Sequence, residues 1–257
     1  SGTVVFAGTQ DTKHVRPTSG GTLTIGSGIT IQSGTGSGGG TVGEGTHALI
    51  NEGTISANAG GGTILVTGGT AGNPWTNAGL LRANGGVLTL GGNWDNNGTI
   101  EVAAGTFTLG GTFTTSQLGE LINSGGTTLL TGTLNNAGTT LALTAAGAGT
   151  GSIQFAGSTG TIQGGTVTAS GGATLLLPNN VTGNFSNGVT LGTNVTVNNN
   201  ARMNVTGGLV LSGATVTLDT SIGNVTALEF NAGAQTLGGS GTVVFAGTQD
   251  TKHVRPT

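Results

Sequence analysis

The sequence contains no cysteine and no tyrosine, and only 6% of its 257 residues are charged. Without cysteine, neither disulfide bonds nor thiolate metal sites are available. Six basic and nine acidic residues leave a net charge of −3, without the basic patch that nucleic-acid binding requires. No apolar run approaches the roughly 18 residues of a membrane-spanning helix. We therefore expect neither a nucleic-acid partner nor a membrane span.

Proline and aromatic residues are also scarce, whereas glycine is abundant. The chain has 4 prolines, 4% aromatic residues and 55 glycines. Glycine without a third-position period, combined with so little proline, excludes a collagen helix. The low charge is unlike that of a disordered tail. Because the apolar residues are mostly small or β-branched, we expect a thin and regular core instead of a large globular centre.

A segment of 18 residues occurs twice without a change, as residues 1–18 and as residues 240–257. The identity includes polar side chains that packing alone would not fix, so we infer tandem copies of a 239-residue unit. We assign residues 1–239 to one β-solenoid unit and residues 240–257 to the start of the next identical unit. The chain is then expected to be a window from the middle of a longer protein, so no signal peptide is expected within this window.

A shorter period predicts the fold. Residues 86–94, 105–113 and 126–134 share one pattern at offsets of 19 and 21 residues. This spacing predicts a parallel β-helix with 19–21 residues per turn and roughly 12 turns per unit. No long apolar stripe with a period of 3.6 residues is present, so we expect no helices.

Side chains alternate within this pattern, which predicts half-buried strands. We expect the second and fourth positions to point inward and to stack from turn to turn as core columns: Ile64, Val66, Leu88, Leu90, Phe107, Leu109 and Leu130. A separate aromatic column is predicted at Trp75, Trp94 and Phe113. We expect this column to close a corner of the core; the alternative is an outward ladder that binds sugar rings.

Three strings, residues 22–31, 49–57 and 94–101, resemble the β-strand repeats of very large secreted bacterial proteins. More broadly, they resemble filamentous haemagglutinin-like adhesins and the passenger stalks of autotransporters. The resemblance implies a right-handed parallel β-helix, export from a bacterium to its surface or surroundings, and a role in adhesion or fibre building. It supplies no catalytic residues.

Charged and polar residues gather in the repeated segment and interrupt the strand pattern. We predict a loop there that contacts a neighbouring filament or a ligand, and the alternative is a solvated excursion. The residues are Gln10, Asp11, Lys13, His14, Arg16, Lys252, His253 and Arg255. Asp11 and His14 lack a third metal ligand, so we expect no metal and no cofactor.

The acidic residues are scattered, which argues against the carbohydrate-cleaving enzymes that share this type of coil. Such enzymes need paired carboxylates or acidic calcium ligands beside a base, and only Asp95 and Glu101 could meet on one turn. We therefore expect no enzymatic activity, with a polysaccharide-acting enzyme as the remote alternative.

Two functions remain, a structural fibre of units stacked head to tail and the stalk of a cell-surface adhesin. The expected partners are adjacent units, neighbouring filaments, and a host surface or polysaccharide.

Overall fold

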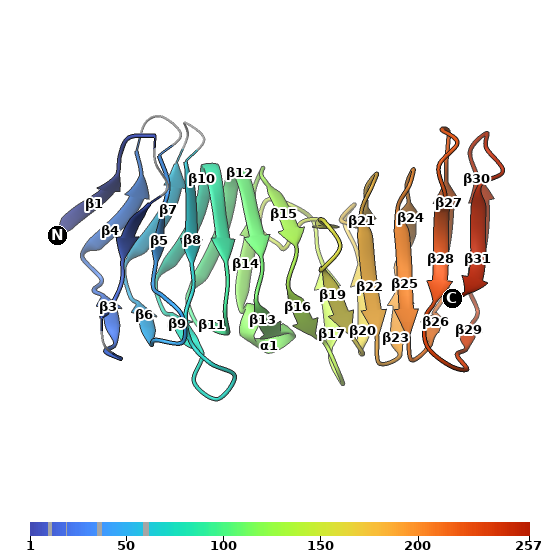
Figure 1. Cartoon of the computed structure of the whole chain (residues 1–257), viewed down its shortest axis with the longest axis horizontal. Coiled ribbons are helices and arrows are strands. Elements are labelled where there is room, and N and C mark those ends of the chain that lie inside the picture. Colours follow the sequence, from blue (N-terminus) through green and yellow to red (C-terminus); the bar gives the residue numbers. More distant parts are fainter. Residues whose placement is uncertain (10–11, 19, 35–37, 59–61) are drawn as a thin grey trace. The chain divides into compact units, whose positions relative to one another are not determined.

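The computed structural model describes residues 1–9, 12–18, 20–34, 38–58 and 62–257. The chain forms an all-β parallel β-solenoid of about ten turns with about 24 residues per turn (Figure 1). This confirms the predicted fold class, while the right-handed sense stays a prediction. Two compact units are present, Ser1–Leu129 with Ala146–Gly149, and Leu130–Ala145 with Thr150–Thr257.

The first unit arranges its strands in three parallel columns. The first column is β1 (Gly2–Phe6), β4 (Ile29–Ser33), β7 (Thr54–Asn58), the first half of β10 (Leu80–Leu90), the first half of β12 (Thr99–Leu109) and β14 (Glu120–Asn123). The second column is β2 (Lys13–Val15), β5 (Gly40–Val42), β8 (Thr63–Val66) and the second halves of β10 and β12. The third column is β3 (Leu23–Ile25), β6 (Leu49–Asn51), β9 (Trp75–Asn77) and β11 (Trp94–Asn96), with β13 (Thr112–Thr114) joined through a parallel bridge between Asn93 and Thr112.

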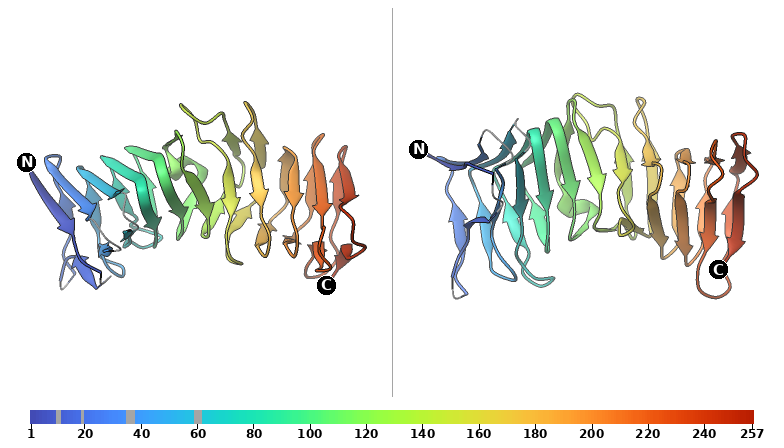
Figure 2. Two further views of the ribbon diagram at one scale, coloured as in Figure 1. Left: turned by 90° about the horizontal axis from the view of Figure 1, so that it is seen from above. Right: turned by 45° about the horizontal axis from the view of Figure 1, so that its top comes forward.

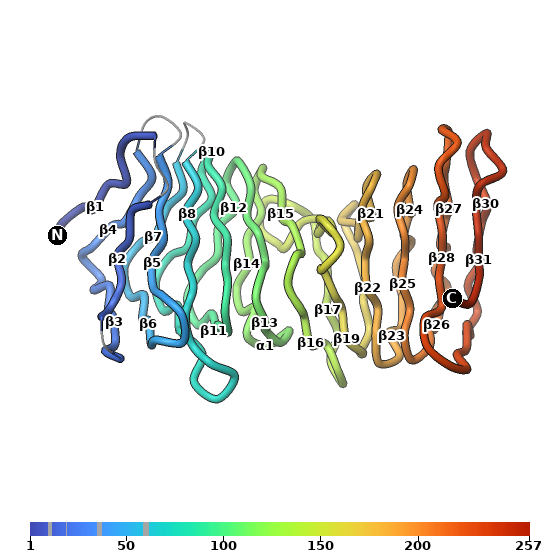
Figure 3. The backbone as a smooth tube through the Cα atoms, viewed as in Figure 1, coloured from blue at the N-terminus to red at the C-terminus, as the bar shows by residue number. Residues whose placement is uncertain are grey.

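The second unit repeats the three-column plan (Figure 3). Its first column is β18 (Ile153–Phe155), β21 (Leu175–Leu177), β24 (Val195–Val197), β27 (Thr215–Asp219) and β30 (Thr242–Ala246). Its second column is β16 (Thr133–Asn135), β19 (Thr161–Gln163), β22 (Thr182–Ser186), β25 (Arg202–Thr206), β28 (Thr226–Phe230) and β31 (Lys252–Pro256). Its third column is β17 (Thr140–Leu143), β20 (Thr166–Ala169), β23 (Val189–Gly192), β26 (Leu209–Leu211) and β29 (Leu237–Gly239). The remaining strand, β15 (Thr127–Leu130), spans the boundary between the two residue ranges.

Turn length varies more than the sequence predicted. Paired residues lie 19 apart at Leu80 and Thr99 and 21 apart at Thr99 and Glu120, but 27 apart at Gly2 and Ile29. Hydrogen bonds between neighbouring turns fix the strands, whereas corners can lengthen without disturbing the ladder. The predicted 19–21 residues therefore describe only part of the chain, and the turns are fewer and longer than expected.

One short helix, α1 (Thr115–Leu118), corrects the expectation that helices are absent. A capping box holds it: the hydroxyl of Thr114 accepts a hydrogen bond from the backbone of Gln117, whose side chain accepts one from the backbone of Thr114. The Thr-x-x-Gln spacing is a sequence signature of this motif. Because the helix is a single turn with Leu118 buried, it leaves no periodic apolar stripe to detect.

The predicted core positions lie inside the coil. Leu88 pairs in register with Ile64 and Phe107, and Leu90 pairs with Val66 and Leu109. All of these side chains are buried, as is Leu130 in the second unit. Figure 2 shows the strands of each unit side by side, as the parallel register requires. Burying identical positions turn after turn makes every strand depend on its neighbours.

An asparagine ladder runs through the interior of the first unit. Asn51 donates from Nδ2 to Oδ1 of Asn77 at 2.6 Å, and Asn77 donates in the same way to Asn96 at 2.6 Å. Asn96 then donates to the carbonyl oxygen of Leu118 at 3.0 Å. All three asparagines are buried. The ladder provides hydrogen bonds at a corner where polar groups are removed from water.

Candidate functional site

The repeated segment forms the same two strands in both places. In the first copy, residues 1–18, these are β1 and β2, and in the second copy, residues 240–257, they are β30 and β31. The glycine after the first strand has a positive φ in both copies, +88° at Gly8 and +79° at Gly247. The glycine at the corner after the first strand therefore has the same left-handed conformation in both copies.

The two copies pair through opposite edges. In the first copy, β1 pairs with β4 and β2 pairs with β5, which both belong to the turn that follows. In the second copy, β30 pairs with β27 and β31 pairs with β28, which both belong to the preceding turn. One sequence thus makes parallel ladders on both of its edges, one edge in each copy.

Gly8 and its counterpart Gly247 each lie in close contact with the backbone of the neighbouring turn. A Cβ atom added to Gly38, in the turn after the first copy, would lie 2.0 Å from the carbonyl oxygen of Gly8. A Cβ atom added to Gly247 would lie 2.2 Å from the carbonyl oxygen of Thr220, in the preceding turn. Close backbone contact at this corner therefore occurs on both sides of the repeated segment, and glycine permits it.

The phenylalanine of the repeated segment is buried in one copy and exposed in the other. Phe6 is 3% exposed, because the following turn covers it, whereas its counterpart Phe245 is 53% exposed. Val254 of the second copy is also exposed, whereas its counterpart Val15 is half-buried. The comparison shows what a following turn does to this surface: it removes a large aromatic side chain from water.

An arginine in each copy forms an ion pair across its paired edge. In the first copy, Arg16 lies 2.5 Å from Glu44 of the following turn. In the second copy, Arg255 lies 2.7 Å from Glu229 of the preceding turn, and Glu229 also binds Arg202, one turn further back, at 3.1 Å. The Glu229 side chain is 6% exposed and the arginines about 41%. The buried carboxylate is therefore neutralised from both sides.

Glu44 and Glu229 belong to the acidic residues that are scattered in the sequence, where nothing indicates their partners. All four arginines of the chain, including Arg82 with Glu101 at 3.0 Å, bind a glutamate about one turn away. The spacing of opposite charges by one turn could have identified these pairs in the sequence. Recognising this spacing requires the local turn length to be known.

The remaining predicted contact residues lie in strands, so the expected protruding loop is corrected for the described part of the segment. Lys13 and the exposed His14 are in β2, where the Lys13 ammonium group contacts the carbonyl oxygen of Gly39 at 3.4 Å. Lys252 and His253 are in β31, and Lys252 donates to the carbonyl oxygen of Gln249. Gln10 and Asp11 lie outside the described residues. Parallel pairing forms here because polar side chains can occupy the outward positions of a strand.

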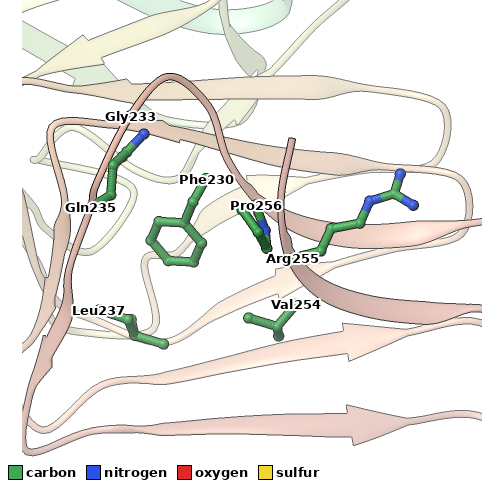
Figure 4. A pocket seen from close by; sticks show the side chains of 7 residues that line it. All are labelled: Phe230, Gly233, Gln235, Leu237, Val254, Arg255 and Pro256. Carbon is green, nitrogen blue, oxygen red and sulfur yellow. The ribbon is translucent and has the colours of Figure 1, made fainter.

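An open hollow of about 300 Å³ lies beside the second copy. Phe230, Leu237 and Val254 face it, as Figure 4 shows. The other lining residues are Gly233, Gln235, Arg255 and Pro256. The hollow is mainly apolar and adjoins β29, whose Leu237 is 39% exposed. It therefore extends the exposed apolar surface of the second copy.

The aromatic column faces inward. Trp75, Trp94 and Phe113 are each 1% exposed, and the rings of Trp94 and Phe113 stack with centroids 4.3 Å apart. Each indole nitrogen donates at 2.9 Å to a backbone carbonyl, that of Gly91 or Gly110. These side chains fill a corner of the core and offer no outward platform for a sugar ring.

The acidic pair considered for catalysis is divided between two columns. Asp95 lies in β11 of the third column, and Glu101 lies in β12 of the first column, where it binds Arg82. Among the residues that the structure describes, no three His, Asp or Glu side chains are grouped as a metal site requires. Within the same residues, no helix has the length and apolar character to cross a membrane.

The repeated segment, with an edge for pairing on each side, is therefore the most distinctive surface of the chain. Comparison with known proteins found no matching family model, no matching curated protein and no matching solved structure. The class is thus defined by the fold itself, a parallel β-solenoid with about ten turns.

Proposed function

We propose that the chain is a structural repeat of an extracellular bacterial fibre, in which identical β-solenoid units continue head to tail. The observation that carries the proposal is the pairing of one 18-residue sequence through opposite edges in its two copies. A copy between two units would use both edges at once. The solenoid would then cross from unit to unit without a break in its ladders.

The side chains of the repeated segment suit this central position. With turns on both sides, its phenylalanine would be covered as Phe6 is, and its arginine would lie between the partners of Arg16 and Arg255. Glu229 of one unit and Glu44 of the next would then flank a single arginine. Alternating charges on successive turns stabilise such a stack because each charge has opposite neighbours.

The use of the charged residues supports a mechanical role. Charge makes up 6% of the chain, and every arginine is used in a pair between turns. Repeat proteins of this type gain stability from stacking, so additional units reinforce one another. The proposed partners are the adjacent units, and the proposed location is the bacterial surface or its surroundings.

The proposal is tested with a polypeptide that contains residues 1–239 twice, followed by residues 240–257. Negative-stain electron microscopy and small-angle X-ray scattering should detect one straight particle. The second copy of residues 1–239 should add about ten turns and thus about 50 Å of length, at about 4.8 Å per strand. A matched control replaces the central copy of the segment with 18 residues of glycine and serine. The control should show two particles joined by a hinge.

A two-unit polypeptide that bends at the central copy as freely as the glycine–serine control would refute the proposal. A straight particle of the expected length would support the continuation of the solenoid from one 239-residue repeat to the next, which the fibre requires.

A further inference from the structure

We infer that an extended segment of another polypeptide binds the free edge of β17 as an added strand. The site belongs to the five-stranded sheet that runs in the order β17, β20, β23, β26 and β29. The segment that fits this edge has aliphatic and small polar side chains in alternation and no charged residue. The inference goes beyond the proposed fibre, because it does not depend on how one unit continues into the next.

β17 pairs with a neighbouring strand along only one of its edges. The partner is β20, in a register that places Thr140 beside Thr166 and Ala142 beside Thr168. β17 is the first strand in the order of its sheet, and within the described part of the chain no strand pairs with its other edge. β17 is therefore an edge strand, although strands that precede and follow it in the sequence are paired.

The free edge presents backbone groups that are available for pairing. The amide of Thr166 donates to the carbonyl oxygen of Thr139 at 2.9 Å, so the odd-numbered residues face β20. The N–H and C=O groups of Thr140 and Ala142 face the other way, because successive residues of a strand alternate. Among the described residues, the one hydrogen bond to these groups is a long one, 3.4 Å from the Thr150 hydroxyl to the carbonyl oxygen of Ala142. Such a row of groups is a template for another strand.

The loop after β17 closes one end of this edge. The amide of Thr144 donates to the hydroxyl of Thr150 at 2.9 Å. The carbonyl oxygen of Thr144 accepts a hydrogen bond from the amide of Gly151 at 3.0 Å. Because Thr144 faces the same way as Ala142, these bonds occupy the position where a longer added strand would continue. The bound segment is therefore short and lies beside residues 140–142.

The edge lacks two features that commonly prevent pairing with other chains. Natural edge strands often carry charged side chains or proline, whereas β17 has the sequence Thr-Leu-Ala-Leu. Residues 121–201 contain no Asp, Glu, Lys, Arg or His. The side chains of Thr140 and Ala142 are small and exposed. An unprotected edge of this kind favours the binding of a second polypeptide.

The side chains of β17 define the segment that fits. Leu141 and Leu143 point into the coil and are 2% and 1% exposed, so aliphatic groups of the added strand would lie on that face. Thr140 and Ala142 point outward, where small side chains would lie beside them. Matching side chains on neighbouring strands stabilise their pairing. β20 has this alternation in the sequence Thr-Val-Thr-Ala and already pairs with β17 through the opposite edge.

A synthetic peptide with the sequence of residues 164–171, which contains β20, is the probe for this site. It should bind the full chain with a dissociation constant of about 0.1–1 mM, because the contact is short. Hydrogen–deuterium exchange at the amides of Thr140 and Ala142 should slow when the peptide is added. A control peptide with proline in place of Val167 and Ala169 lacks the N–H groups that would face β17, so it should not bind.

Two substitutions on the edge should weaken binding of the peptide. Ala142→Pro removes an N–H group that faces away from β20, so it should keep the existing ladder and weaken binding about tenfold. Thr140→Lys adds a charge of the kind that protects natural edges and should weaken binding by a similar factor. Thr190→Lys is the matched control, because β23 is paired on both edges, with β20 and β26; this variant should bind like the unmodified chain.

Circular dichroism checks that each variant keeps its β structure. If the proline variant loses it, Thr140→Lys decides the result, because this side chain is exposed and points outward. Three results would overturn the inference: no binding at about 1 mM peptide, equal binding by the Thr140 and Thr190 variants, or slower exchange at strands other than β17. The straightness of the two-unit polypeptide is measured separately, so the fibre and the edge site can fail independently.

Discussion

The aromatic ring of Phe6 packs against Gly40 of the following turn, where an added Cβ atom would lie 2.9 Å from two ring atoms and 2.8 Å from the carbonyl oxygen of Lys13. This contact joins the repeated segment to the turn after it. The glycine is required by the approach of a buried side chain and a backbone, since no flexible group can move aside.

Substitution Gly40→Ala should therefore loosen the first turn by about 1–3 kcal/mol, the usual cost of overpacking. Hydrogen–deuterium exchange of the amides in β1 and β2 measures the opening free energy of this turn. Gly26→Ala is the control, because an added Cβ atom there meets no heavy atom within 4 Å. Equal exchange rates in the two variants would show that Phe6 does not hold the turn.

Glu229→Gln should destabilise the end of the second unit by about 1–2 kcal/mol, less than a fully buried pair would lose, because both arginines remain partly exposed. The neutral amide removes the charge shared by Arg202 and Arg255. Chemical denaturation gives the change in stability. Added sodium chloride should weaken the unmodified chain more than the variant, because salt screens the ion pairs.

The exposed Glu52 provides a matched control for that experiment. Glu52→Gln should change stability by less than about 0.5 kcal/mol, as expected for a surface position. A Glu229 variant with the stability and salt response of the Glu52 variant would mean that the paired arginines contribute nothing.

Asn77→Ala should cost about 2–4 kcal/mol, because it leaves two buried hydrogen-bonding groups of Asn51 and Asn96 without their partner. Thermal unfolding followed by circular dichroism measures the loss. Asn97→Ala, at an exposed neighbouring position, should have little effect. If both variants unfold at the temperature of the unmodified chain, the ladder does not stabilise the coil.

The two tryptophans of the chain, Trp75 and Trp94, should fluoresce as buried indoles, because each is 1% exposed. Their emission should resist quenching by iodide until the first unit unfolds, and soluble polysaccharides should leave it unchanged. Trp94→Ala should cost about 3–5 kcal/mol through the cavity it creates. A spectral shift on addition of polysaccharide to the folded chain would contradict the inward placement of the column.

The sequence predicted those parts of the fold that depend on local alternation. Ile64, Leu88 and Phe107 stand in one register because strands expose one face and bury the other. Turn length was predictable only around residues 80–120, where the corners are short. Elsewhere, corners such as the one closed by the antiparallel bridge between Thr70 and Asn73 change the spacing without changing the buried pattern.

Only part of the candidate site could be predicted from the sequence. The identity of residues 1–18 and 240–257 was plain, but the opposite pairing of the two copies depends on which turn lies beside each. Lys13 and Arg16 suggested a loop because charged residues are uncommon in strands. They lie in or beside β2, where outward positions tolerate charge and Glu44, 28 residues away, supplies the partner of Arg16.

The hydrogen bonds between turns have a mechanical consequence. A turn of about 24 residues occupies about 4.8 Å along the direction of stacking, whereas its extended chain would measure about 80 Å. Tension along that direction acts on the hydrogen bonds between turns. Detachment of one turn would release a length of chain many times greater than the height that the folded turn occupies. A fibre built from such coils would lengthen in steps under load and would recover its length as the turns reattach.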